Sequence, residues 1–182
     1  MRRGALCLCI IAFLTTLSLG FGQAGGKNKK PQPSAPAHLM VTPDAVKWEL
    51  PQPSWVQGTP PPEFQGQPPF TVAVLEGDPT KMGAPFVLRL KTPDGYKVAP
   101  HWHPQDENIT IIQGTFYLAT GDKFDQNAGH ALTAGAYALM PRRVHHFGWS
   151  EGETIIQVHG LGPFKIIFLN PAAGSPQKPK AK

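Results

Sequence analysis

Cysteine is almost absent from the sequence. Of 182 residues only Cys7 and Cys9 are cysteines, and both lie in an apolar stretch near the N-terminus. The rest of the chain therefore offers no disulfide framework and no thiolate for nucleophilic attack or metal binding. Charged residues are also scarce, at 16%, whereas hydrophobic residues reach 41%, a balance that favours a packed core over a disordered chain.

A hydrophobic run long enough to span a membrane is absent as well. The apolar stretch covers residues 5–19, shorter than the roughly 20 residues that a bilayer requires. It follows Arg2 and Arg3 and is followed by small residues up to Ala24, a pattern typical of an export signal. We therefore expect residues 1–24 to be a signal peptide, the mature protein to be periplasmic or secreted, and no stable membrane insertion after cleavage.

The excess of basic charge is not spread over the chain. The formal net charge is +5, but residues 31–177 contain nine Lys and Arg against twelve Asp and Glu. The remaining basic residues lie in the signal-like segment and in short stretches close to the two ends. Because no basic stripe with interleaved aromatics occurs, we expect no nucleic-acid partner. Residues 173–182 are expected to be a basic disordered tail.

The proline content divides the chain into two regions of different composition. Residues 25–69 are rich in proline, which fixes φ and removes a backbone donor, so we expect a tether followed by an extended packing segment with one edge strand near residues 46–50. From Phe70 onwards, short runs of β-branched and aromatic residues alternate with turn residues, and helical periodicity is absent. This pattern predicts an antiparallel sandwich or barrel over residues 70–172. The predicted strands include residues 70–75, 85–90, 109–112, 115–119, 137–140, 154–158 and 164–169.

The densest group of potential ligands lies in the segment from Gly95 to Gly114. On a strand, side chains alternate between faces, so His101 and His103 point the same way. Three residues of turn then bring Glu107 beside them on the next strand. Two imidazoles and a carboxylate on one face form a site that suits a divalent transition metal.

The same residues resemble the cupin superfamily. Glycine, five residues, His-x-His, three residues, glutamate, six residues and glycine is the first cupin motif, and the segment 95–114 matches it at every position. The second motif, glycine, five residues and PxGxxHxxxN, is matched over residues 135–150 except that Arg143 replaces its turn glycine and Ser150 its asparagine. The departure at Arg143 indicates either a turn that avoids positive φ or a strained one. His145 and His146 must face opposite sides of a strand, and the motif count favours His146 as the ligand.

This resemblance implies an all-β fold, a double-stranded β-helix or jelly-roll barrel of the small single-barrel type, with a Pro-rich N-terminal extension. The implied ligands of one divalent ion (Fe, Mn, Ni, Cu or Zn) are His101, His103, Glu107 and His146. Four ligands leave one or two positions of an octahedral ion open for water or substrate. The resemblance also implies a small-molecule ligand or substrate, and by analogy a homodimer.

Two functions remain open from the sequence. The first is a metal-dependent enzyme, dioxygenase-like or isomerase- or decarboxylase-like; the second is a non-catalytic cupin that binds or senses a small molecule or metal. No general acid or base is identifiable beyond the ligands, so no catalytic residue is assigned. The candidates for the substrate pocket are Tyr117, Tyr137, Gln157 and His159, with a structural role equally open for His159.

Overall fold

A computed structural model describes residues 38–169 of the chain. The expected signal peptide (1–24), the first part of the expected tether and the expected basic tail (173–182) lie outside the described residues. None of the helices between residues 38 and 169 has the length and apolar character needed to cross a membrane.

The described chain is built almost entirely from strands. The only helical elements in residues 38–169 are four single 3₁₀ turns: η1 (Pro43–Ala45), η2 (Pro53–Trp55), η3 (Pro62–Phe64) and η4 (Gln126–Ala128). The strands are β1 (Val56–Gln57), β2 (Thr71–Gly77), β3 (Pro85–Thr92), β4 (Lys97–Trp102), β5 (Glu107–Thr120), β6 (His130–Thr133), β7 (Tyr137–Met140), β8 (His146–Leu161) and β9 (Ile166–Phe168). The predicted all-β fold class is confirmed.

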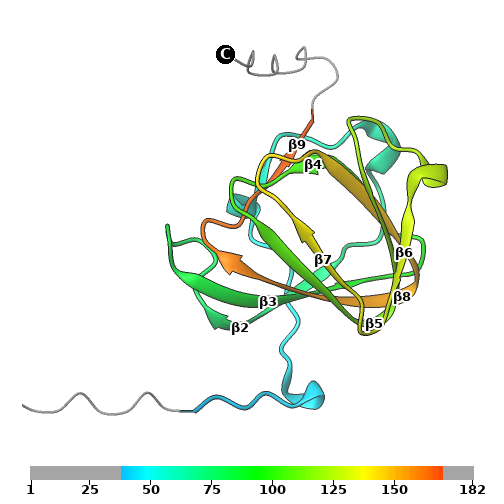
Figure 1. The fold of residues 1–182 in the computed structure, drawn as a ribbon. Helices are drawn as coiled ribbons and strands as arrows, with labels where there is room; N and C mark the ends of the chain where they lie inside the picture. The colour runs from blue at the N-terminus through cyan, green and yellow to red at the C-terminus, as the bar shows by residue number, and fades with distance from the viewer. Residues whose placement is uncertain (1–37, 170–182) are drawn as a thin grey trace, which may run out of the picture. The chain divides into compact units, whose positions relative to one another are not determined.

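The long strand β8 organises the sheet. It pairs antiparallel with β3 and β5 along most of its length and with β4 at its N-terminal end. The order β1-β9-β4-β8-β3-β2 forms one path, and β5 adds β6 and β7 beside it. Figure 1 shows these strands curling around a common interior, as in a cupin jelly roll. The sequence predicted two strands, 109–112 and 115–119, where the structure has the single strand β5, because β5 bends at a bulge instead of turning back. Of β8, only residues 154–158 were predicted.

The bulge at Gly114 changes which residues face the interior. Before it, the buried positions of β5 are the odd-numbered Ile109 and Ile111; after it they are the even-numbered Phe116 and Leu118. Gly114 has φ +78°, and a Cβ there would lie 2.6 Å from the carbonyl oxygen of Glu153, so only glycine fits. The glycine predicted to sit in a turn between strands therefore redirects a single strand.

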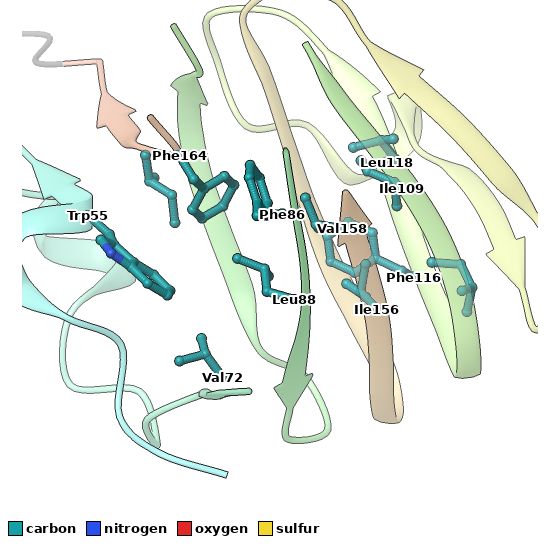
Figure 2. Packing of buried hydrophobic residues seen from close by; sticks show 12 residues of the cluster. Trp55, Val72, Phe86, Leu88, Ile109, Phe116, Leu118, Ile156, Val158 and Phe164 are labelled. Atoms are coloured by element: carbon teal, nitrogen blue, oxygen red, sulfur yellow. The ribbon is translucent and has the colours of Figure 1, made fainter. Parts of the chain in front are cut away.

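The apolar interior connects the barrel with the segment before it (Figure 2). Trp55 of η2 is 2% exposed and packs edge-on against Phe164, with ring centroids 6.0 Å apart. The same segment adds β1, which pairs with β9, and a bridge between Glu49 and Val72. The twelve buried members of this core are Trp55, Val72, Phe86, Leu88, Ile109, Ile111, Phe116, Leu118, Ile156, Val158, Phe164 and Ile166.

Candidate metal centre

Four buried polar side chains meet where three strands begin or end. His101 of β4 and His146 of β8 are direct cross-strand partners. His103 follows the end of β4, and Glu107 begins β5 after a short turn. Each of the four is exposed by 6% or less, which is unusual for such groups unless they are paired or bind a metal.

The three imidazoles are held in the same manner by backbone carbonyls. Nδ1 of His101 lies 2.7 Å from the Ala99 oxygen, Nδ1 of His103 lies 2.6 Å from the Lys165 oxygen, and Nδ1 of His146 lies 2.9 Å from the Val144 oxygen. Since a carbonyl only accepts, each Nδ1 must donate. In the neutral ring this leaves an unprotonated Nε2 with its lone pair free, which is the tautomer that a metal ligand requires.

The Nε2 atoms of His103 and His146 face the carboxylate of Glu107. Nε2 of His103 lies 3.3 Å and Nε2 of His146 lies 3.5 Å from the same oxygen of Glu107, Oε2. The His103 Nε2 is buried and makes no hydrogen bond of good geometry. Ligand atoms of His101, His103 and His146 all lie within 4.8 Å of one another. Two neutral rings would place their lone pairs on this carboxylate with no proton between them, so the groups pair only through a proton on one ring or through a cation. Three imidazole nitrogens and one carboxylate oxygen suit a divalent transition metal.

The pKa shifts follow from this arrangement. Burial, reinforced by His146 and His103, holds the pKa of His101 well below its usual value, so its ring is neutral at neutral pH. Burial is the largest single influence on His103 and acts to lower its pKa, but the charge of Glu107, its polar contact with Nε2 and the hydrogen bond to the Lys165 carbonyl together outweigh it and raise that pKa. For Glu107, burial is the largest single influence and acts to raise the pKa, but the charges of His103 and His146 and their polar contacts with the carboxylate together keep it well below the usual value. The carboxylate is therefore ionised and available as a ligand.

Two hydrogen bonds donated by backbone N–H groups fix the turn that carries His146 against the turn that carries His103. The N–H of Arg143 donates to the carbonyl oxygen of His103 at 2.9 Å, and the N–H of Arg142 donates to Oδ1 of Asp106 at 2.8 Å. Arg143 has φ +64°, so of the two alternatives for the missing motif glycine, the strained turn is the one observed.

A cavity of about 90 Å³ extends from the four side chains into the barrel. This is room for several waters or one small organic molecule. Most of its wall is apolar and comes from inward-facing strand residues such as Phe116, Leu118 and Ile156. The polar wall residues other than the His and Glu cluster are Gln67, Thr92, Tyr96 and Lys97. Burial raises the pKa of Tyr96 to about 12, so its hydroxyl remains a neutral donor.

None of the four predicted pocket residues lines this cavity. The Tyr117 hydroxyl donates to Glu151 at 2.7 Å, and the Tyr137 hydroxyl donates to Asn108 at 2.8 Å. Gln157 accepts a hydrogen bond from Arg89 at 3.2 Å, and His159 offers its carbonyl to Asn108.

Alternation along the strands explains these positions. If side chains alternated regularly along β5 from the buried Glu107, the odd-numbered Tyr117 would point into the barrel. The bulge at Gly114 shifts the alternation by one residue, so Tyr117 points away from the cavity. On β8 the inward positions are Ile156 and Val158, so their neighbours Gln157 and His159 point away. His145, the alternative to His146, is half-buried, and its Nδ1 lies 2.7 Å from Oδ1 of Asp122, away from the cluster.

The structure adds wall residues that the sequence did not single out. Pro60, Phe64, Gln67 and Phe70 line the cavity from within the Pro-rich segment. Such a segment has no periodicity from which a buried face can be read. The one available signal was the presence of large aromatics among its prolines, because Phe64 is only 8% exposed.

Comparison with known proteins supports the fold. An acetylacetone dioxygenase from Acinetobacter johnsonii is similar over 79% of this chain and 84% of its own, with 14% identity and a TM-score of 0.53. The polyketide cyclase RemF from Streptomyces resistomycificus is similar over 74% of this chain and 89% of its own, with 19% identity and a TM-score of 0.52. No protein-family model and no curated protein sequence matches the chain.

Proposed function

We propose that the protein binds one divalent transition-metal ion through His101, His103, Glu107 and His146 and uses it to act on a small organic molecule. The observation that carries this proposal is the convergence of three backbone-oriented imidazoles, two of which, His103 and His146, also face the buried carboxylate of Glu107. In a self-contained cluster a proton on His103 would pair with Glu107, but at 3.3 Å Nε2 of His103 makes no hydrogen bond of good geometry with the carboxylate, which supports a cation at this position instead.

The chain's own residues would prepare such an ion for chemistry in three ways. The carbonyls of Ala99, Lys165 and Val144 orient the rings. The apolar wall excludes bulk water from the metal end of the cavity. A bound ion would supply Lewis acidity and a template at its remaining coordination positions. An acetylacetone dioxygenase and a polyketide cyclase are about equally similar to the chain, so the fold is compatible with an oxidoreductase but does not select the reaction.

The second candidate is a non-catalytic protein that binds a small molecule or a metal. It is favoured by the composition of the cavity wall, where Tyr96 and Lys97 are the only ionisable residues apart from the four proposed ligands. No further carboxylate or imidazole in the described wall is positioned as a general acid or base. Whether the protein turns over a substrate therefore distinguishes the enzyme from the binding protein.

Elemental analysis tests the metal site. We expect close to one transition-metal ion per chain in the wild type and in His145→Ala, and less than a tenth of that in His101→Ala and His146→Ala. The neighbouring His145 is the matched control, because its side chain contacts Asp122 and not the cluster. Equal metal content in all four proteins would refute the ligand assignment.

Oxygen uptake tests catalysis. The protein is reconstituted with Fe, Mn or Ni and offered acetylacetone and a panel of aromatic diols. Uptake that requires both the metal and His146 supports the enzyme, and metal binding without turnover of any substrate supports the binding protein.

A further inference from the structure

The Pro-rich segment of residues 60–70, which we call the strap, forms part of the cavity wall. Phe64 lies at the end of η3 and is buried, although no strand crosses this part of the chain. Its ring packs edge-on against Phe124, with centroids 5.2 Å apart, and both Phe64 and Phe70 line the cavity. The strap therefore contributes to the wall that limits the space in the cavity.

The strap is attached to the barrel by the side chain of Gln67. Its Nε2 donates to the carbonyl oxygen of Lys97 at 2.9 Å, and its Oε1 accepts from the N–H of Lys97 at 2.7 Å. The amide thus satisfies both backbone groups of one residue of β4, as a neighbouring strand would do. The same Nε2 also donates to the carbonyl oxygen of Phe64 at 2.8 Å, so one side chain fixes Phe64 and β4 together.

The rest of the strap adds little polar attachment. Its backbone hydrogen bonds within the described chain are local, from Phe64 to Pro61 and from Gln65 to Pro62. The side chain of Gln65 donates only to Pro60, within the strap itself. The position of Phe64 against the cavity therefore depends on Gln67 and on aromatic packing. Since β4 also carries His101, the attachment is on the strand that holds the metal site.

We infer that Phe64 and Gln67 determine which molecules the cavity accepts: the Phe64 ring limits their size, and Gln67 holds the ring in that place. The inference deepens the proposed function, because it concerns the same cavity. The wall is made only of the chain's own residues, so the inference can be tested with or without a metal.

The first test uses metal-free protein and two apolar probes, benzene and naphthalene, with binding followed by NMR shifts of the cavity methyl groups of Ile109, Ile156 and Val158. We expect the wild type to bind benzene at least ten times more tightly than naphthalene. Phe64→Ala should tighten naphthalene binding at least tenfold while benzene changes less than threefold. Gln67→Ala should also reduce the preference for benzene over naphthalene, and Gln65→Ala should leave that preference unchanged.

The second test uses protein loaded with Co²⁺ and two ligands with the same donor, imidazole and 4-phenylimidazole, followed by the visible spectrum of the ion. The larger ligand should gain at least tenfold in affinity in Phe64→Ala, with imidazole almost unchanged. If Phe64→Ala does not fold, Phe64→Leu replaces it. If the Phe64 and Gln67 variants discriminate between small and large probes as the wild type does, the inference is overturned. If the protein does not bind Co²⁺ but the variants do change the preference for benzene over naphthalene, only the proposed function is overturned.

Discussion

The barrel interior contains two buried polar clusters, and they differ in how their polar atoms are satisfied. One consists of three hydroxyl side chains, Thr92, Ser150 and Thr154, each exposed by 3% or less. The other consists of the three imidazoles and Glu107. Thr92 and the imidazole cluster both line the cavity, so burial alone does not distinguish them.

The hydroxyl cluster is complete within the chain. The hydroxyls of Thr92 and Ser150 lie 2.6 Å apart, Thr92 also donates to the Thr154 carbonyl, and the Thr154 hydroxyl donates to the carbonyl of Thr115. Every donor has an acceptor, which is the usual condition for buried polar groups. Ser150, which replaces the asparagine of the second cupin motif, is therefore accommodated as a structural residue.

In the imidazole cluster, hydrogen-bond partners satisfy the Nδ1 atoms but not all of the Nε2 atoms. The Nδ1 atoms are satisfied by carbonyls, whereas Nε2 of His103 and Nε2 of His146 lie 3.3 and 3.5 Å from the same Glu107 oxygen and need a proton or a cation to pair with it. A buried cluster whose polar atoms all have hydrogen-bond partners stabilises the fold, whereas a cluster whose acceptors converge on one point indicates a cation-binding site.

The largest expected difference between the two clusters is in how added metal changes the free energy of unfolding. At about 100 times the dissociation constant, a bound ion should raise the free energy of unfolding by about 2.7 kcal/mol, because it binds only the folded chain. We expect this rise in urea titrations of the wild type and of Ser150→Ala, but not of His146→Ala. An equal rise in His146→Ala would mean that the ion binds elsewhere.

A second prediction concerns the hydroxyl cluster. Thr154→Val keeps the side-chain shape but removes the fully buried hydroxyl, leaving the part-buried carbonyls of Thr115 and Gly152 without that donor. The free energy of unfolding should fall by about 1–3 kcal/mol. Metal content, measured on the same preparation, should remain that of the wild type. Loss of metal in this variant would show that the two clusters are not separate.

The smallest predicted effect lies in the turn before His146. Arg143→Gly should raise the free energy of unfolding by up to about 1 kcal/mol, because glycine adopts a positive φ without the steric cost paid by other residues. The backbone N–H that donates to His103 is retained. Urea unfolding measures the gain, and Arg143→Ala is the control in which no gain is expected. A gain in both variants would assign the effect to the arginine side chain.

The sequence predicted the strand class and the grouping of His101, His103, Glu107 and His146 because both depend on local rules. Strand alternation puts His101 and His103 on one face, and a short turn returns the chain at Glu107. The structure places these four side chains together; that they bind a metal remains a prediction.

The cavity wall could not be predicted in the same way. A bulge shifts the alternation by one residue, and nothing in the sequence around Gly114 distinguishes a bulge from a turn. Tyr117 is therefore outside, stacked on Trp149 with centroids 4.8 Å apart. The strap residues contact the cavity through the non-local pairing of Gln67 with Lys97, thirty residues away, which no local pattern encodes.

The most direct test of the account is the X-ray absorption spectrum of the chain loaded with one equivalent of Zn²⁺. The account predicts the outer-shell scattering of three imidazoles, with nitrogen at about 2.0–2.1 Å and at least one oxygen in the first shell. His145→Ala should give the same spectrum, and His146→Ala should lose one imidazole. A first shell of water oxygens without imidazole scattering would contradict the central claim that these side chains form a metal site.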